Sequence, residues 1–282
     1  MIPGASAEQQ VLLVDLVSIG VCVLLAWHAP WFMPFRYYVV GIHETWHAIG
    51  AIVTLNGVVS IELTADEGGV TTYTVRSWNA RVTSAVVLPA GYICTPLMGS
   101  LLIISSGTGV GVAISGILCA LVSTVLLVLL LCGGDTPPKI VFSVGVILAI
   151  TAVCTSLYAT ATAPLRVWLL CLGVLQWMYG LYDIYDDTLA RVVDASDVSE
   201  FSKLCPCWAT QTHARVWFTL VLAMGVCSVA VPLVYLSPGS GRTEAVCFGC
   251  IHAVWPVGAL CVMWVTSACN LADASRLIVS GR

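Results

Sequence analysis

The most informative shortage in this 282-residue chain is a shortage of charge. Only 9% of its residues are Asp, Glu, Lys or Arg, whereas 59% are hydrophobic. Soluble domains carry about a quarter charged residues, so this composition excludes an ordinary soluble domain. The formal net charge of −4 also argues against a nucleic-acid partner, which would call for a basic surface. We therefore expect the lipid bilayer to be the main partner, and we expect no nucleic acid.

Two features of a cleaved signal peptide are also missing near the N-terminus. No basic residue precedes the first apolar run, and no clear small-residue cleavage site follows it. Secretory signal peptides carry both features. We therefore expect residues 11–27 to form a retained membrane span.

Cysteine, in contrast, is plentiful, with 13 residues in the chain. Most of these cysteines stand singly inside apolar runs, where a free cysteine behaves as a small hydrophobic residue. We interpret them as mainly reduced and structural rather than as a disulfide scaffold.

Apolar runs of near membrane-spanning length fill most of the sequence. A transmembrane helix needs about 20 predominantly apolar residues. Runs of about this length, separated by segments rich in proline and glycine, lie at 11–28, 35–55, 81–105, 109–132, 139–160, 165–186, 214–237 and 249–270. The sequence predicts an all-α polytopic membrane protein, with about eight transmembrane helices in a single integral membrane domain over 1–282.

Two stretches between these runs are more polar. Residues 57–76 alternate apolar and polar side chains around Gly68-Gly69, a pattern that predicts a small β-hairpin. Residues 187–213 are polar and irregular, and we expect them to form a cytosolic segment.

The positive charges suggest an orientation, because cytoplasmic loops of membrane proteins are enriched in Lys and Arg. With the N-terminus in the cytosol, most of these residues fall on the cytosolic side. They are Arg76, Arg81, Lys139, Arg191, Lys203, Arg215, Arg276 and Arg282. Only Arg36, Arg166 and Arg242 fall outside. We expect a multi-pass protein with both termini in the cytosol, although the sequence does not name the organelle.

The second apolar run contains the pattern H-E-x-x-H, formed by His43, Glu44 and His47. In a helix, residues four positions apart share a face, so both imidazoles can bind one ion. Ionisable residues at membrane depth are costly and are usually functional. The pattern predicts a zinc ion, Zn²⁺, held by His43 and His47, with Glu44 as the general base.

Two histidines leave a catalytic zinc one protein ligand short. The best supply is the acidic group at the end of the 165–186 run, which contains Asp183, Asp186 and Asp187. Asp183 lies deepest in the apolar run and is the predicted third ligand, with Asp187 as the alternative. Asp186 is better explained as a helix cap or a solvated charge.

Several motifs follow one another along the chain. They are His43-Glu44-x-x-His47, the hairpin with Gly68-Gly69, Pro89-Ala-Gly-Tyr92, Asp183-Ile-Tyr-Asp-Asp187, Asp194-Ala-Ser-Asp197 and Cys205-Pro206. Together they resemble a known family, the B-like branch of the site-2 proteases in peptidase family M50. These proteases are intramembrane zinc metallopeptidases. The resemblance implies that both histidines and an aspartate of the Asp183–Asp187 motif bind zinc, with Glu44 as the general base. Ile184 follows Asp183, where better-known members have glycine.

The leading hypothesis is therefore a zinc-dependent intramembrane endopeptidase that cleaves a transmembrane protein or peptide. A metal or proton transporter could use the same His, Glu and Asp side chains within the membrane. Many transporters contain paired repeats, and the sequence shows none. An inactive membrane scaffold is the third hypothesis, although every residue of the H-E-x-x-H motif is intact.

Overall fold

The computed structural model describes residues 6–64, 68–76, 78, 80–133, 136–190, 193–194 and 196–236. Within this part of the chain, eight α-helices follow one another. They are α1 (Ala7–Ala26), α2 (Met33–Val53), α3 (Ala80–Ser105), α4 (Gly109–Gly133), α5 (Pro138–Ser156), α6 (Ala163–Ile184), α7 (Asp197–Leu204) and α8 (Thr210–Tyr235). Short turns η1 (Pro30–Phe32) and η2 (Leu157–Ala159) precede α2 and α6, and a π-helical turn, η3 (Tyr185–Ala190), extends α6.

Six of the described helices are long and apolar enough to cross a membrane, namely α1, α3, α4, α5, α6 and α8. The protein is therefore a multi-pass membrane protein with an all-α framework. Each of the six coincides with a run predicted from the sequence. The run predicted at 249–270 lies outside the described residues.

The run predicted at 35–55 does form a helix, α2, but α2 is not among the six candidate spans. Most of its side chains are buried in the bundle, including the polar side chains of Arg36, His43, Glu44 and His47. Polar groups are costly in lipid and are tolerated where protein or a cavity surrounds them. The position of α2 inside the bundle explains its lower hydropathy.

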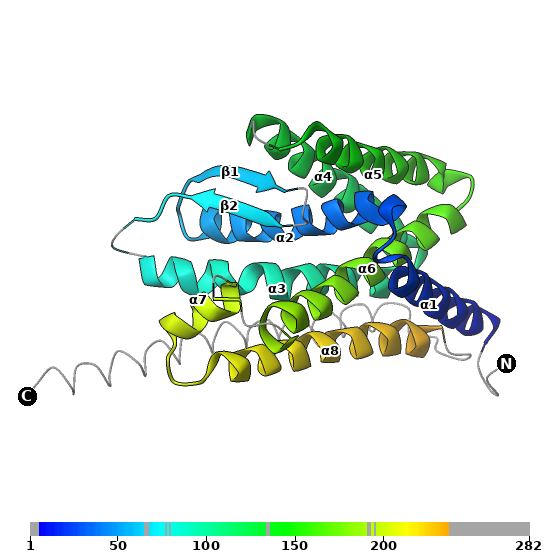
Figure 1. Ribbon diagram of the computed structural model, residues 1–282. Helices are drawn as coiled ribbons and strands as arrows, with labels where there is room; N and C mark the ends of the chain where they lie inside the picture. The colour runs from blue at the N-terminus through cyan, green and yellow to red at the C-terminus, as the bar shows by residue number, and fades with distance from the viewer. Residues whose placement is uncertain are drawn as a thin grey trace, which may run out of the picture.

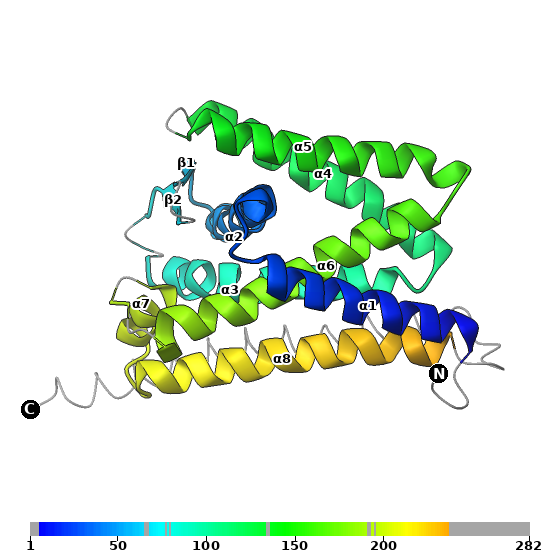
Figure 2. The ribbon, with the colours of Figure 1, turned by 45° about the vertical axis from the view of Figure 1, so that its right-hand side comes forward.

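The helices form layers around α2, as Figures 1 and 2 show. Helices α4 and α5 pack together on one side, α3 and α6 cross through the middle, and α1 and α8 lie on the opposite side. The crossing of α3 and α6 depends on small residues, since a Cβ on Gly99 would lie 2.5 Å from the carbonyl oxygen of Gly173. This close crossing fixes α6 relative to α3 and α2.

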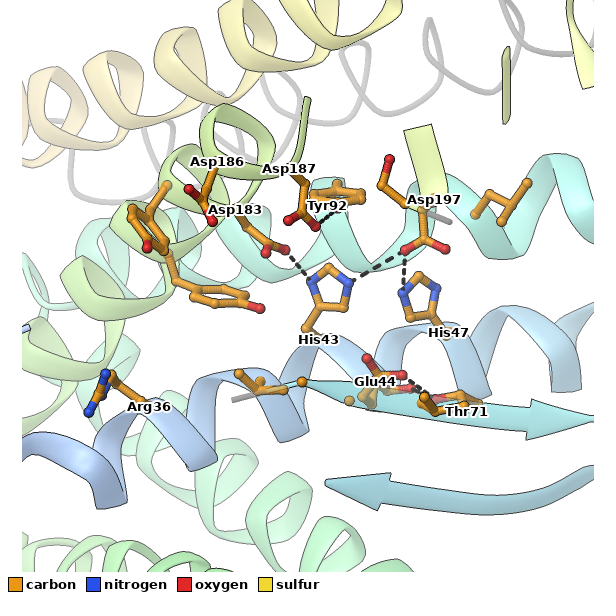
Figure 3. A pocket seen from close by; sticks show the side chains of 18 of the residues that line it. Arg36, His43, Glu44, His47, Thr71, Tyr92, Asp183, Asp186, Asp187 and Asp197 are labelled. Atoms are coloured by element: carbon orange, nitrogen blue, oxygen red, sulfur yellow. Dashed lines mark hydrogen bonds and ion pairs between the residues drawn. The ribbon is translucent and has the colours of Figure 1, made fainter. Parts of the chain in front are cut away.

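The predicted hairpin after α2 is confirmed. Strands β1 (Val58–Leu63) and β2 (Gly69–Tyr73) pair antiparallel beside the C-terminal half of α2. Ile61 and Leu63 of β1 are buried against the bundle. Both views place the hairpin and α7 at the same end of the molecule. The side chains of His43, Glu44 and His47 lie beside them (Figure 3).

Candidate metal centre

The H-E-x-x-H residues lie on α2 as the spacing predicts, and all three side chains are buried. His43 and His47 are one helical turn apart, and their ring centroids are separated by 4.8 Å. Their Nε2 atoms point toward the same space between α2, α3 and α7 (Figure 3). The two rings therefore present adjacent nitrogen donors.

The third donor comes from Asp197, the first residue of α7. Its Oδ2 atom lies 3.1 Å from His47 Nε2 and 3.7 Å from His43 Nε2. Ser196 caps the helix by accepting a hydrogen bond from the backbone N–H of Ser199, which fixes where α7 begins. Donor atoms of His43, His47 and Asp197 all lie within 4.8 Å of one another, and together they could hold a metal ion.

Gly91 of α3 keeps the space between these donors open. A Cβ atom at this position would overlap His43 Nε2 and would lie 2.5 Å from His47 Nε2. The point where both histidines converge therefore faces bare backbone. Two imidazole nitrogens and one carboxylate are a set of protein ligands that catalytic zinc sites use, so these residues fit a zinc ion.

The second nitrogen of each ring also lies close to an oxygen atom, although only that of His47 is within hydrogen-bond geometry. His47 Nδ1 lies 2.7 Å from the carbonyl oxygen of Val87, and His43 Nδ1 lies 3.4 Å from Asp183 Oδ2. Metal-binding histidines commonly donate their other ring N–H to a carbonyl or carboxylate, which fixes the tautomer and the ring orientation. Both rings are therefore oriented to present Nε2.

The aspartates predicted from the sequence lie close by, on α6 and η3. Asp183 contacts the far side of the His43 ring rather than Nε2. Asp187 accepts a hydrogen bond from the Tyr92 hydroxyl at 3.0 Å, and Asp186 lines the same cavity. The ligand role of Asp183, or of Asp187, stays a prediction.

Asp197 was not predicted as a ligand. It belongs to the Asp194-Ala-Ser-Asp197 motif, but it follows a polar segment beyond the apolar run. Membrane depth favours aspartates inside the apolar run, so it misses Asp197, which α7 brings back to the histidines. The Asp194-Ala-Ser-Asp197 motif was the feature of the sequence that could have identified this ligand.

Asp197 is held as a charged group. Burial by itself raises the pKa of its carboxyl, but attraction to His47 and contacts with both imidazoles outweigh burial and hold that pKa well below its ordinary value. An ionised carboxylate accepts hydrogen bonds and coordinates cations.

The side chains of His43, His47 and Asp197 line a cavity of about 630 Å³. These three candidate donor residues line it together with Glu44 and the inner face of β2. The cavity is also lined by Trp27, Arg36 and Tyr182. The cavity is large enough for a peptide segment beside the donors.

Comparison with known proteins agrees with this geometry. The sequence profile of the Peptidase M50B-like family matches residues 16–232, which include α2, the hairpin, Asp183 and Asp197. Neither the curated proteins nor the solved structures gave a match. Because the family match covers most of the sequence, the chain belongs to the Peptidase M50B-like family.

Proposed function

We propose that the protein is a zinc-dependent intramembrane endopeptidase. One observation carries the proposal: an Asp197 oxygen faces the Nε2 atoms of both H-E-x-x-H histidines beside a cavity inside a multi-pass membrane protein. Family membership supports a metallopeptidase, since the family is typically zinc-dependent.

We assign the ligand roles to His43, His47 and Asp197. In this assignment Asp183 orients the His43 ring through Nδ1, as carboxylates beside metal-bound histidines commonly do. The alternative is the ligand set predicted from the sequence, in which Asp183 or Asp187 replaces Asp197. Metal analysis of single variants separates the two.

When bound, zinc would acidify a water molecule and polarise the scissile carbonyl group. Glu44 lies next to His43 on α2, and its carboxylate lines the same cavity. As general base, the Glu44 carboxylate accepts a proton from the attacking water and then delivers it to the leaving nitrogen.

We propose a membrane-embedded protein or peptide as the substrate. The inner face of β2 lines the cavity, and among the described residues β2 pairs only with β1. An extended substrate segment could add to the free edge of β2 through main-chain hydrogen bonds. Extended backbone exposes a peptide bond that a helix shields.

The expected topology belongs to the same proposal. With α2 counted as membrane-embedded and the predicted run at 249–270 included, the chain would cross the bilayer about eight times. Both termini and the 187–213 segment would lie in the cytosol, and the cavity would open toward that side.

The function is tested with purified protein reconstituted in lipid vesicles and a pool of quenched fluorescent transmembrane peptides. Wild type is expected to cleave members of the pool, and Glu44→Gln is expected to cleave them roughly 100- to 10,000-fold more slowly while keeping its zinc. Cleavage by Glu44→Gln at the wild-type rate would refute the assigned base. Zinc flux across the vesicle membrane without any cleavage would favour a transporter instead.

A further inference from the structure

Two small residues of β2, Gly69 and Thr71, lie where the inner face of this strand meets Glu44 on α2. In an antiparallel pair, residues directly opposite each other point to the same face. Thr71 pairs with Ile61 and Gly69 pairs with Leu63, and both of these β1 side chains are buried. Thr71 and Gly69 therefore face α2, whereas Thr72 points away and is exposed.

Thr71 contacts Glu44 twice. Its hydroxyl lies 2.7 Å from Glu44 Oε2 and 2.9 Å from the Glu44 carbonyl oxygen, with the hydroxyl as donor in both contacts. A glutamate side chain otherwise has considerable rotamer freedom. A donor that spans the backbone and the carboxylate of one residue restricts that freedom.

Gly69 adds a steric restriction beside the same carboxylate. A Cβ atom at this position would lie 2.5 Å from Glu44 Cγ and 2.6 Å from Oε1. No side chain other than hydrogen fits there unless the carboxylate moves. Glu44 is thus enclosed by β2, with a donor at one oxygen and bare backbone at the other.

The hairpin that carries these residues is itself anchored. Leu63 is buried against Gly41 of α2, where a Cβ would lie 3.3 Å from its Cδ1 atom. Ile61, opposite Thr71, is fully buried. Because buried Ile61 lies directly opposite Thr71 in the hairpin, this apolar anchor limits how far the Thr71 hydroxyl can move from α2.

From these contacts we infer that Thr71 is a positioning residue for Glu44, and that Gly69 makes room for the position it sets. The inference rests on the proposed function, in which Glu44 is the general base. The Thr71 side chain does not touch substrate in this assignment. Its hydroxyl selects the orientation of the Glu44 carboxylate from which the proton transfer occurs.

The test compares Thr71→Val with Thr71→Ser and Thr72→Val. Valine has nearly the same shape as threonine and suits a strand, so Thr71→Val removes the donor without disturbing the hairpin. We expect kcat on the fluorescent transmembrane peptides to fall roughly 10- to 100-fold, with KM and zinc content unchanged. Thr71→Ser, which keeps the hydroxyl, should recover most of the rate.

Thr72→Val is the matched control, since it makes the same chemical change at the adjacent exposed position. We expect wild-type kcat from it. An equal loss in Thr72→Val and Thr71→Val would assign the effect to the strand rather than to the hydroxyl and would overturn the inference.

A second readout needs neither metal nor turnover. In metal-free protein labelled with ¹³C at the glutamate carboxyl carbon, the Glu44 signal is the one that disappears in Glu44→Gln. We expect this signal to shift in Thr71→Val and to stay in place in Thr71→Ser and Thr72→Val. An unmoved signal in Thr71→Val would overturn the inference.

The two readouts separate this inference from the proposed function. If wild type cleaves no peptide but the Glu44 signal responds to Thr71→Val, the positioning contact stands and the peptidase assignment fails. If wild type cleaves and Thr71→Val matches it in kcat, the peptidase assignment stands and the positioning role is wrong.

Discussion

Asp197 Oδ2 lies 3.1 Å from His47 Nε2, although the two residues belong to different helices, α7 and α2. Asp197 is also 3.7 Å from His43 Nε2, whereas Asp183 is 3.4 Å from the opposite nitrogen of that ring. The two carboxylates therefore approach His43 from opposite sides. This difference gives them different expected roles.

Asp197→Asn is expected to lose zinc far more completely than Asp183→Asn. Removing a ligand leaves only two protein donors, whereas removing a carboxylate that orients a ligand typically lowers metal affinity by about 10- to 100-fold. The measurement is zinc content of purified protein dialysed against graded concentrations of chelator. Asp186→Asn, which makes the same change at another aspartate that lines the cavity, is the control.

The reverse order, with Asp183→Asn empty of zinc and Asp197→Asn fully loaded, would return the ligand role to Asp183. Equal retention of zinc in both variants would require another ligand, such as Asp187.

Gly91→Ala is expected to abolish zinc binding without preventing helix formation. Alanine favours a helix more than glycine does, but the new methyl group would overlap the converging Nε2 atoms of His43 and His47. Zinc content and circular dichroism measure the two effects separately. Gly20→Ala is a matched control, because a Cβ at Gly20 meets nothing within 4 Å. Normal zinc content in Gly91→Ala would show that the ion does not bind between these rings.

Removal of zinc is expected to loosen α7 in particular. Asp197 begins this eight-residue helix, so an ion shared with α2 would tie α7 to the bundle. Binding only to the folded state stabilises a protein by about 2.7 kcal/mol at a free ligand concentration 100 times Kd. Hydrogen exchange should therefore quicken in 197–204 when chelator is added, and more than in 109–133. Unchanged protection of α7 would argue against a ligand on that helix.

Tyr92→Phe is expected to keep its zinc and to lose only modest stability. The Tyr92 hydroxyl donates to Asp187 at 3.0 Å, and a typical hydrogen bond contributes about 1 kcal/mol. Thermal unfolding and zinc analysis of this variant give the two values. A large loss of zinc would indicate that Asp187 is itself a ligand, as the alternative from the sequence holds.

The sequence predicted those parts of the fold that depend on local pattern. Apolar runs of membrane-spanning length located six candidate spans and the body of α2, and alternation around Gly68-Gly69 located the hairpin. The periodicity of a helix also placed both histidines on one face. These features follow from short-range geometry and from the cost of exposing polar backbone to lipid.

The contacts that complete the site depend on long-range packing. Asp197 reaches the histidines because η3 ends the apolar helix and α7 returns toward α2, and no local pattern encodes that return. The same holds for Gly91 and Thr71, whose neighbours on α2 are distant in sequence. The position of Asp183 inside the apolar run indicated that it lies at the membrane depth of the histidines, and Asp183 does lie beside His43. Membrane depth alone does not predict which nitrogen of the His43 ring the carboxylate contacts.

Zinc K-edge X-ray absorption of the purified protein would show whether zinc binds between α2 and α7. We expect stoichiometric zinc with imidazole nitrogen and carboxylate oxygen neighbours and no sulfur, and a changed spectrum in Asp197→Asn. Protein that takes up no zinc, or zinc with sulfur neighbours and a spectrum unaffected by Asp197→Asn, would rule out a zinc site at this position.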